Sequence, residues 1–158
     1  KNLVVIGTGT ELPRLQQIAK SNVKILGYQS NSVVQDYLSR ARAFVYAACE
    51  DFGIVLVEAQ ACGTPVIAYG LGGAAETVLD IRNYPDCGTG ILFPTQTTAA
   101  ILAAISTFET YHQQFQAEQI RAHAESFADS VFRSQYLSLL DRYYHRWKSG
   151  TSNQHSGV

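Results

Sequence analysis

The chain has 158 residues, about the size of one domain, and can bury a hydrophobic core without disulfide or metal staples. It is 46% hydrophobic and 16% charged, which is typical of a folded globular domain and excludes a disordered or fibrous one. Its formal net charge of -1 creates no overall positive field, so nucleic acid is not an expected partner.

The cysteine content argues against a fold held together by disulfides or zinc. Cys49, Cys62 and Cys87 are odd in number, and no pair has a Cys-x-x-Cys spacing, which favours a reducing cytoplasm. No apolar run approaches the roughly 20 residues that span a bilayer, and no signal peptide is visible. Because the chain begins directly at a strand-like run, residues 3–6, we expect it to be a fragment that lacks upstream sequence.

Short apolar runs alternate with helix-length segments over the first part of the chain. The predicted elements are strand 3–6, helix 11–20, strand 23–26, helix 32–40, strand 43–46, helix 53–62 and strand 66–68. Strands of about four apolar residues are typical of a parallel sheet that is buried on both faces. The pattern predicts an α/β fold with a doubly wound, Rossmann-like parallel sheet, whose ligands bind beyond the carboxyl ends of the strands.

The rest of the chain is predicted to be mainly helical. The expected elements are a flexible loop 70–73, helix 74–79, surface loop 82–90, strand 91–93, and helices 98–109, 113–126 and 129–148. The last helix carries one stripe of large apolar side chains, formed by Phe132, Tyr136, Leu139, Leu140, Tyr143 and Trp147. Residues 149–158 are small and polar, so we expect a domain over residues 1–148 and a disordered tail.

The segment from Glu50 to Glu58 follows the third predicted strand and is the main candidate site. Gly53 allows a tight turn and a close approach of a ligand to the backbone. The helix then begins with free amides from Phe52, Gly53 and Ile54, which favour an anion or an electron-rich oxygen. Glu58 lies four residues after Ile54, on the same face of the helix. An acid in so apolar a segment needs donors, and ribose hydroxyls are suitable ones.

A purely structural role explains the same two glutamates equally well. In that interpretation Glu50 caps the helix and Glu58 accepts a hydrogen bond from a buried backbone amide. The spacing of the pair does not decide between the two interpretations.

The wider sequence does favour one of them. Glu50-Asp51-Phe52-Gly53 is followed by Glu58-Ala59-Gln60-Ala61-Cys62-Gly63-Thr64-Pro65-Val66-Ile67-Ala68 and then by Gly72-Gly73-Ala74-Ala75-Glu76-Thr77-Val78. Two glutamates separated by seven residues, a Gly-x-Pro-Val-Ile strand entry and a Gly-Gly-x-x-Glu turn resemble the signature of glycosyltransferase family 4, which has the two-domain GT-B fold. The resemblance covers most of residues 1–110. The particular form of the motifs in this chain, with Glu-Asp-Phe-Gly at residues 50–53, looks most like that of bacterial mannosyltransferases of surface-polysaccharide assembly.

The resemblance implies a role for each matching position around the glutamates. Glu50 would be the catalytic residue, lying against the hydroxyls and anomeric region of the donor sugar either as a nucleophile or only to orient the sugar. Phe52, Gly53 and Ile54 would offer backbone amides to the sugar and diphosphate. Glu58 would accept hydrogen bonds from the ribose.

The base of the nucleotide would lie against a second loop. Leu26, Tyr28 and Gln29 would border the base, with Tyr28 as a stacking face. The alternative for Tyr28 is a surface tyrosine that covers the edge of the sheet.

The resemblance also implies an overall activity. The chain would be the donor-binding C-terminal domain of a retaining glycosyltransferase, moving a hexose such as mannose from GDP-mannose or a UDP-hexose to a glycan or lipid-linked acceptor. The family's arginine and lysine that clamp the diphosphate precede the first strand, and Arg14 and Lys20 do not match them, so the fragment alone is expected to be inactive. No metal or other cofactor is expected, because no Asp-x-Asp motif is present and the four histidines lack metal-ligand spacing.

Three other functions stay open at this point. A sugar-nucleotide epimerase of GT-B architecture would bind similar ligands but lack this glutamate spacing, and a non-catalytic nucleotide-binding module is a further alternative. Gly7-x-Gly9 resembles half of a dinucleotide fingerprint, but Leu12 stands where the third glycine belongs, so a NAD site is not favoured.

The end of the last helix combines basic and aromatic residues. Arg142, Arg146 and Lys148 interleave with Tyr143, Tyr144 and Trp147. Such a helix suits either a membrane surface, here the cytoplasmic face of the inner membrane, or packing on the missing N-terminal domain, and the second is favoured.

Overall fold

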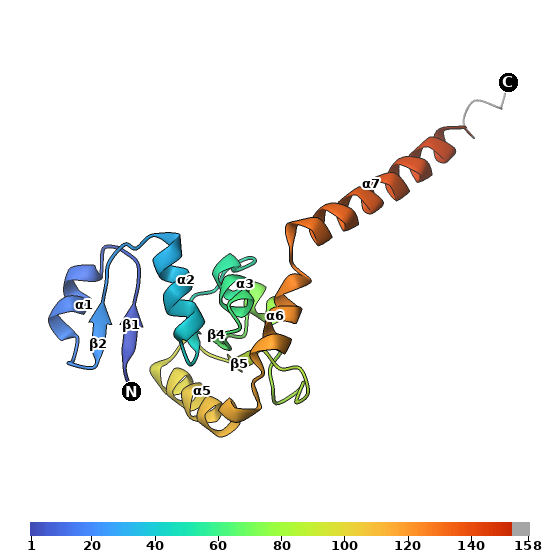
Figure 1. The fold of residues 1–158 in the computed structure, drawn as a ribbon. Helices are drawn as coiled ribbons and strands as arrows, with labels where there is room; N and C mark the ends of the chain where they lie inside the picture. Colours follow the sequence, from blue (N-terminus) through green and yellow to red (C-terminus); the bar gives the residue numbers. More distant parts are fainter. Residues whose placement is uncertain (153–158) are drawn as a thin grey trace.

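A computed structural model describes residues 1–152 and shows an α/β body from which the last helix projects (Figure 1). The elements in chain order are β1 (Leu3–Val5), α1 (Leu12–Ile18), β2 (Val23–Ile25), α2 (Asn31–Arg40), β3 (Phe44–Tyr46), α3 (Ile54–Ala61), β4 (Val66–Tyr69), α4 (Gly73–Thr77), β5 (Gly90–Phe93), α5 (Thr98–Tyr111), the 3-10 turn η1 (His112–Gln114), α6 (Ala117–Glu125) and α7 (Asp129–Ser152). The order confirms the predicted alternation of strands and helices.

All of the strand pairs are parallel, which confirms the predicted α/β class. The strands are hydrogen-bonded in two groups, β1–β2 and β3–β4–β5, rather than in one continuous sheet. Helix α2 follows β2 and connects the two groups, and β1–β2 lies to one side of it in Figure 1. The polypeptide between Phe44 and Phe93 therefore builds the main sheet.

Strand β4 lies at the centre of the main sheet and explains why helices cover both of its faces. Val66 and Ala68 face a core cluster that includes Leu56 from α3, whereas Ile67 faces a cluster that includes Phe108 from α5. Neighbouring residues of a strand point to opposite faces, so a continuous apolar run requires a helix layer on each side. This arrangement is the doubly wound packing that the sequence predicts.

The predicted helix 113–126 is interrupted in the structure. The chain is extended at Phe115, between η1 and α6. The Phe115 ring stacks on that of Phe108, with centroids 5.5 Å apart, so the break brings an aromatic side chain into the core beside α5. Tertiary packing thus overrides the local helical preference.

The segment before β5 is held by a buried carboxylate. Asp80 is 4% exposed and accepts hydrogen bonds from the Leu92 amide at 2.9 Å, the Arg82 amide at 3.0 Å and the Arg82 guanidinium at 2.8 Å. Burial alone would raise the pKa of Asp80, but the hydrogen bonds from Arg82 and the two amides outweigh it and lower that pKa. The predicted surface loop 82–90 is therefore anchored at its start.

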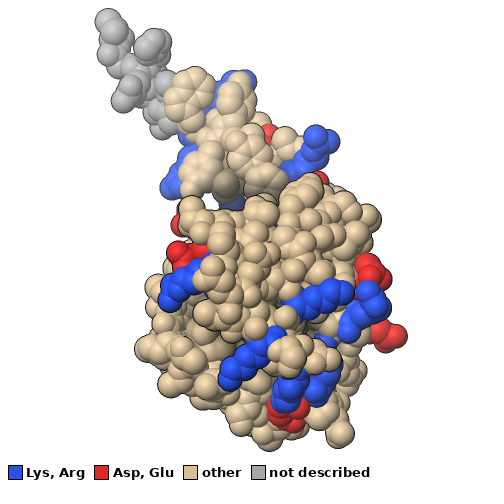
Figure 2. All heavy atoms as spheres, turned by 90° about the vertical axis from the view of Figure 1, so that its left-hand side faces the viewer, with Lys and Arg blue, Asp and Glu red and all other residues tan. Residues whose placement is uncertain are grey.

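Helix α7 extends further than predicted. It includes residues 149–152, which the sequence assigned to a disordered tail, while residues 153–158 lie outside the part that the structure describes. Its predicted apolar stripe is exposed along its length, formed by Phe132, Tyr136, Leu139, Leu140, Tyr143 and Trp147. In Figure 2 basic side chains lie beside the uncharged surface of this helix. The other lysines and arginines visible in that view are scattered over the body, and acidic residues lie near several of them.

Candidate functional site

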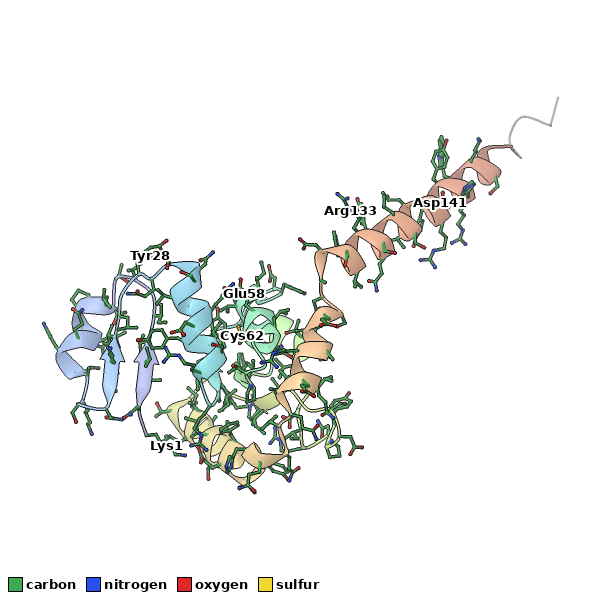
Figure 3. The ribbon with its side chains drawn as sticks, in the orientation of Figure 1. Lys1, Tyr28, Glu58, Cys62, Arg133 and Asp141 are labelled. Carbon is green, nitrogen blue, oxygen red and sulfur yellow. The ribbon has the colours of Figure 1, made fainter. Side chains whose placement is uncertain are left out.

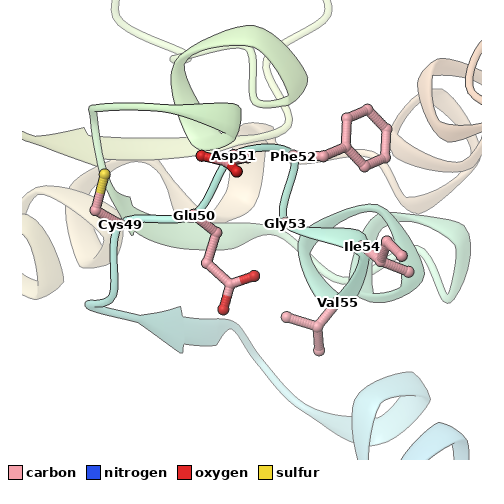
Figure 4. Close-up of a pocket in the computed structure, with 7 residues that line it drawn as sticks. All are labelled: Cys49, Glu50, Asp51, Phe52, Gly53, Ile54 and Val55. Carbon is pink, nitrogen blue, oxygen red and sulfur yellow. The ribbon is translucent and has the colours of Figure 1, made fainter.

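The loop between β3 and α3 forms an open hollow at the carboxyl end of the main sheet. Seven consecutive residues line it, Cys49, Glu50, Asp51, Phe52, Gly53, Ile54 and Val55 (Figure 4). Four of the predicted site residues, Glu50, Phe52, Gly53 and Ile54, are therefore brought together. None of the residues that line the hollow is a lysine or an arginine.

Gly53 makes the turn from the loop into α3. Its φ angle of +77° lies in the left-handed region, which L residues with a side chain rarely adopt. A Cβ at this position would also lie 2.8 Å from Cδ1 of Leu56, a buried core residue. The predicted need for glycine is confirmed, on both conformational and steric grounds.

The first turn of α3 leaves backbone donors available. No side chain caps the helix, and within residues 1–152 the amides of Phe52, Gly53 and Ile54 donate to no protein acceptor. Free amides at a helix N-terminus, together with the helix dipole, form a binding site for an anion or a polarised oxygen.

The backbone of Glu50 is fixed by the loop that follows β4. Glu50 and Gly72 form a parallel β-bridge, and the Gly73 amide donates to the Glu50 carbonyl oxygen with an N···O distance of 2.7 Å. A Cβ on Gly72 would lie 2.3 Å from the Glu50 carbonyl oxygen, and one on Gly73 would lie 2.1 Å from the Phe52 carbonyl oxygen. The glycines predicted to give a flexible loop instead permit two backbones to pack tightly.

The side chain of Glu50 has a partner that the sequence did not reveal. The Tyr46 hydroxyl, at the end of β3, donates a hydrogen bond to Oε1 of Glu50. This bond, reinforced by burial and by the carboxylate charge, raises the pKa of Tyr46 to about 12. The four-residue spacing across the loop was the only available signal. We therefore count Tyr46 as part of the site.

Glu58 is positioned as predicted but is not buried as predicted. It lies on α3 one turn after Ile54, and both side chains are exposed. Within the described part of the chain, no hydrogen bond or ion pair holds its carboxylate. The expectation that the apolar segment would bury this acid is wrong, because Ile54 and Glu58 lie on the outward face of α3, where Ile54 is 66% exposed, whereas Leu56 on the other face is in the core.

The residues predicted to border the base lie on the other strand group. The Gln29 side chain donates to the Leu26 carbonyl at 2.9 Å, while Tyr28 is 80% exposed. Figure 3 shows Tyr28 and Glu58 on opposite sides of α2 in that view. Leu26, Tyr28 and Gln29 do not line the hollow around Glu50.

Phe52 connects the hollow to the end of the α/β body. Its ring packs edge-on against Phe127, with centroids 6.0 Å apart, and Phe127 in turn packs edge-on against His123 of α6. Phe127, two residues before the start of α7, is therefore in contact with the candidate site. No sequence pattern indicates this contact, because it joins residues 75 positions apart.

Residues 1–152 contain neither a cluster of metal-ligating side chains nor a membrane-spanning helix. No group of three or more histidine, cysteine, aspartate or glutamate side chains could hold a metal ion in this part of the chain. Among the same residues, no helix is sufficiently long and apolar to cross a bilayer.

Comparison with known proteins identifies relatives along most of this fold. A family model described as "Glycosyl transferases group 1" matches residues 1–109. The chain is 40% identical over 87 residues to a GDP-mannose-dependent monoacylated alpha-(1-6)-phosphatidylinositol monomannoside mannosyltransferase of Corynebacterium glutamicum, covering 48% of this chain and 23% of that protein. It is 35% identical over 140 residues to a D-inositol 3-phosphate glycosyltransferase of Rhodococcus erythropolis, covering 80% of this chain and 30% of that protein.

Solved structures share the fold at lower identity. Sucrose-phosphate synthase from Thermosynechococcus elongatus superposes with a TM-score of 0.70 at 24% identity, covering 92% of this chain and 39% of that one. Anabaena HepE in complex with UDP superposes with a TM-score of 0.67 at 23% identity, covering 90% of this chain and 41% of that one. The chain thus spans less than half the length of each of these four proteins.

Proposed function

Because the chain belongs to the group 1 glycosyl transferases, we propose that it is the donor-binding domain of a retaining glycosyltransferase that transfers a hexose from a nucleoside-diphosphate sugar. One observation carries the proposal beyond family membership. The Glu50 carboxylate and the free amides at the start of α3 line the same hollow, so an acceptor of hydroxyl hydrogen bonds lies beside an anion site. A nucleotide sugar carries both kinds of group on neighbouring atoms.

Four residues that line the hollow, and Glu58 outside it, have roles in this proposal. Glu50 binds hydroxyls of the donor sugar near its anomeric carbon, and the amides of Phe52, Gly53 and Ile54 bind the sugar and diphosphate oxygens. The same amides stabilise negative charge on the leaving diphosphate, because they are already oriented before the reaction. Glu58, exposed one turn along α3, accepts hydrogen bonds from the ribose.

The base lies toward the β1–β2 group. We assign Leu26, Tyr28 and Gln29 to its surroundings, with the exposed ring of Tyr28 as a stacking face. The hydrogen bond from Gln29 to Leu26 keeps this loop turned back on itself.

The names of relatives support mannose as the leading candidate for the sugar. The Corynebacterium relative is named as GDP-mannose-dependent and as acting on a phosphatidylinositol mannoside, whereas HepE was crystallised with UDP. We therefore propose GDP-mannose or a UDP-hexose as the donor, and a glycan or lipid-linked molecule at the cytoplasmic membrane face as the acceptor.

Helix α7 supports the idea of a second domain. Its apolar stripe projects from the body, and within the described residues Phe132, Tyr136 and Tyr143 of the stripe are exposed (Figures 1 and 2). We propose that the acceptor-binding domain of the complete enzyme packs on this stripe, and that an arginine and a lysine upstream of the first strand complete the diphosphate site.

Binding of nucleotide sugars tests the donor site directly. The complete enzyme is titrated with GDP-mannose, UDP-glucose and NAD, and the titrations are repeated with Glu58→Ala and with Glu125→Ala, a matched change of an exposed glutamate on α6. We expect one nucleotide sugar to bind, NAD not to bind, and only Glu58→Ala to weaken binding, by about 3- to 10-fold for one or two lost hydrogen bonds. If no nucleotide sugar binds, or if both variants bind like the parent, the donor-site assignment is wrong.

Turnover tests the role of Glu50 in the complete enzyme. Glu50→Ala should lower the rate of sugar transfer much more than the affinity for the bare nucleotide, because Glu50 is assigned to the sugar and not to the nucleotide. An unchanged rate would exclude Glu50 from the donor-sugar site.

A further inference from the structure

We propose that Tyr46 is a positioning residue, which holds the Glu50 carboxylate in the orientation that receives the hydroxyls of the donor sugar. The inference rests on the proposed function of the hollow and adds a residue to it. Tyr46 does not line the hollow itself, so it acts through Glu50.

The Tyr46 ring is fixed by the main core. It lies at the last position of β3, stacks on Phe44 with centroids 5.9 Å apart, and packs with Phe44 against the cluster that contains Leu56 and Val66. Two-residue spacing on a strand places both rings on one face of the sheet. The Tyr46 hydroxyl is therefore held beside the loop between β3 and α3 by a rigid strand.

Glu50 is otherwise fixed only at its backbone. The Gly73 amide and the bridge to Gly72 hold its main chain, but the carboxylate is separated from that anchor by rotatable side-chain bonds. The Tyr46 hydroxyl binds Oε1, and no other hydrogen bond from residues 1–152 reaches the carboxylate. Figure 4 shows the Glu50 and Val55 side chains pointing into the same space, while Phe52 points away from it.

The chemistry of the pair suits recognition of sugar hydroxyls. A carboxylate accepts about four hydrogen bonds, so one bond from a phenol leaves the second oxygen and part of the first for a ligand. The hydrogen bond to Glu50 and burial raise the pKa of Tyr46 to about 12, so the phenol stays a neutral donor across the physiological range. Tyr46 can thus orient the Glu50 side chain as a neutral hydrogen-bond donor, and the Glu50 carboxylate keeps its negative charge.

The test separates the sugar from the nucleotide. The complete enzyme and its Tyr46→Phe variant are titrated with GDP-mannose and GDP, and with UDP-glucose and UDP. Tyr46→Phe keeps the stacked ring and removes only the hydroxyl. Tyr69→Phe is the matched control, because Tyr69 also ends a strand and packs in a core, but its hydroxyl has no hydrogen-bond partner among the described residues.

The expected result is a selective loss. Tyr46→Phe should raise the Kd of the nucleotide sugar about 3- to 10-fold, as for a lost hydrogen bond, and leave the Kd of the bare nucleotide within twofold. In a Glu50→Ala background, adding Tyr46→Phe should change neither value, because the group that it positions is gone. Tyr69→Phe should match the parent chain throughout.

A spectroscopic measurement distinguishes positioning from general stability. In chain labelled with ¹³C at tyrosine Cζ, the resonance absent from Tyr46→Phe identifies Tyr46. That phenol should stay mostly protonated at pH 11 in the parent, and a larger fraction of it should be ionised at pH 11 in Glu50→Ala, because loss of the carboxylate lowers the pKa of Tyr46 while burial of the ring still raises it.

Two outcomes would overturn the inference in different ways. If the parent chain binds neither nucleotide sugar, the proposed function fails and Tyr46 loses its role with it. If the parent chain binds one and Tyr46→Phe keeps the same ratio of nucleotide-sugar to nucleotide affinity, the proposed function stands and the positioning role of Tyr46 is refuted.

Discussion

Replacing Gly73 by alanine should break the contact that fixes the site loop. Gly73 begins α4 without a positive φ angle, so alanine suits its backbone conformation and only the added Cβ matters. That Cβ would lie 2.1 Å from the carbonyl oxygen and 2.4 Å from Cα of Phe52. Ordinary contacts begin near 3.4 Å, so one backbone has to move by more than an ångström.

The cost of this movement follows from two effects. Overpacking of a close-packed region costs about 1–3 kcal/mol, and losing the hydrogen bond from the Gly73 amide to Glu50 costs about 0.5–1.5 kcal/mol. We therefore expect Gly73→Ala to lower the free energy of unfolding by about 2–4 kcal/mol. Urea denaturation followed by circular dichroism measures this directly, as a lower midpoint at an unchanged slope.

Gly9→Ala provides the control, since the same substitution there meets no atom within 4 Å and Gly9 has no positive φ angle. It should unfold like the parent chain, or be slightly more stable because alanine reduces the entropy of the unfolded chain. If Gly73→Ala and Gly9→Ala unfold at the same urea concentration, the loop after β4 does not fix Glu50 in the way described here.

Three further substitutions test the scaffold by urea denaturation. Asp80→Asn should lower the free energy of unfolding at pH 7 by about 2–3 kcal/mol, because it leaves Arg82 without its buried partner. Since the pKa of Asp80 is lowered by folding, its stabilising effect is present above about pH 4 and is lost as the pH falls further. The difference in free energy of unfolding between the parent and Asp80→Asn should therefore shrink at pH 3, and a difference that stays constant would contradict this assignment. Thr97→Ala should cost about 1 kcal/mol through loss of the cap that Thr97 provides to the Ala100 amide, and an unchanged midpoint would show that the cap contributes nothing. Leu56→Ala should lower the free energy of unfolding by about 2–5 kcal/mol, because Leu56 is 1% exposed and its truncation leaves a cavity. A decrease below about 1 kcal/mol would mean that the surrounding core collapses into that cavity.

The sequence predicts the elements of this fold well where both faces of a strand are buried. Val66, Ile67 and Ala68 form a continuous apolar run because helices pack on both sides of β4, and that run is visible without any structure. The interruption at Phe115 could not be predicted, since it depends on stacking with Phe108 and not on the local sequence.

The candidate site is predictable only in the parts that depend on local geometry. The tight turn at Gly53 is indicated by the glycine itself, and the common face of Ile54 and Glu58 follows from their spacing; the structure agrees with both. The hydrogen bond from Tyr46 and the packing of Gly73 against Phe52 depend on how the two loops meet in space. The sequence singles out Phe52 and Gly73 by their motifs, but it indicates neither their contact with each other nor any role for Tyr46.

The charges of the hollow indicate which groups of the proposed ligand this chain would bind and which it would leave to the rest of the enzyme. The start of α3 is equivalent to roughly half a positive charge, whereas Glu50 and Asp51 place two carboxylates in the same lining. Because no lysine or arginine lines the hollow, the amides offset only part of this negative charge, and a diphosphate would add more of the same sign. Carboxylates are good acceptors for sugar and ribose hydroxyls, so this chain is better suited to those groups than to the phosphates. We therefore expect the complete enzyme to bring cationic side chains to the diphosphate, as the arginine and lysine of the family resemblance imply.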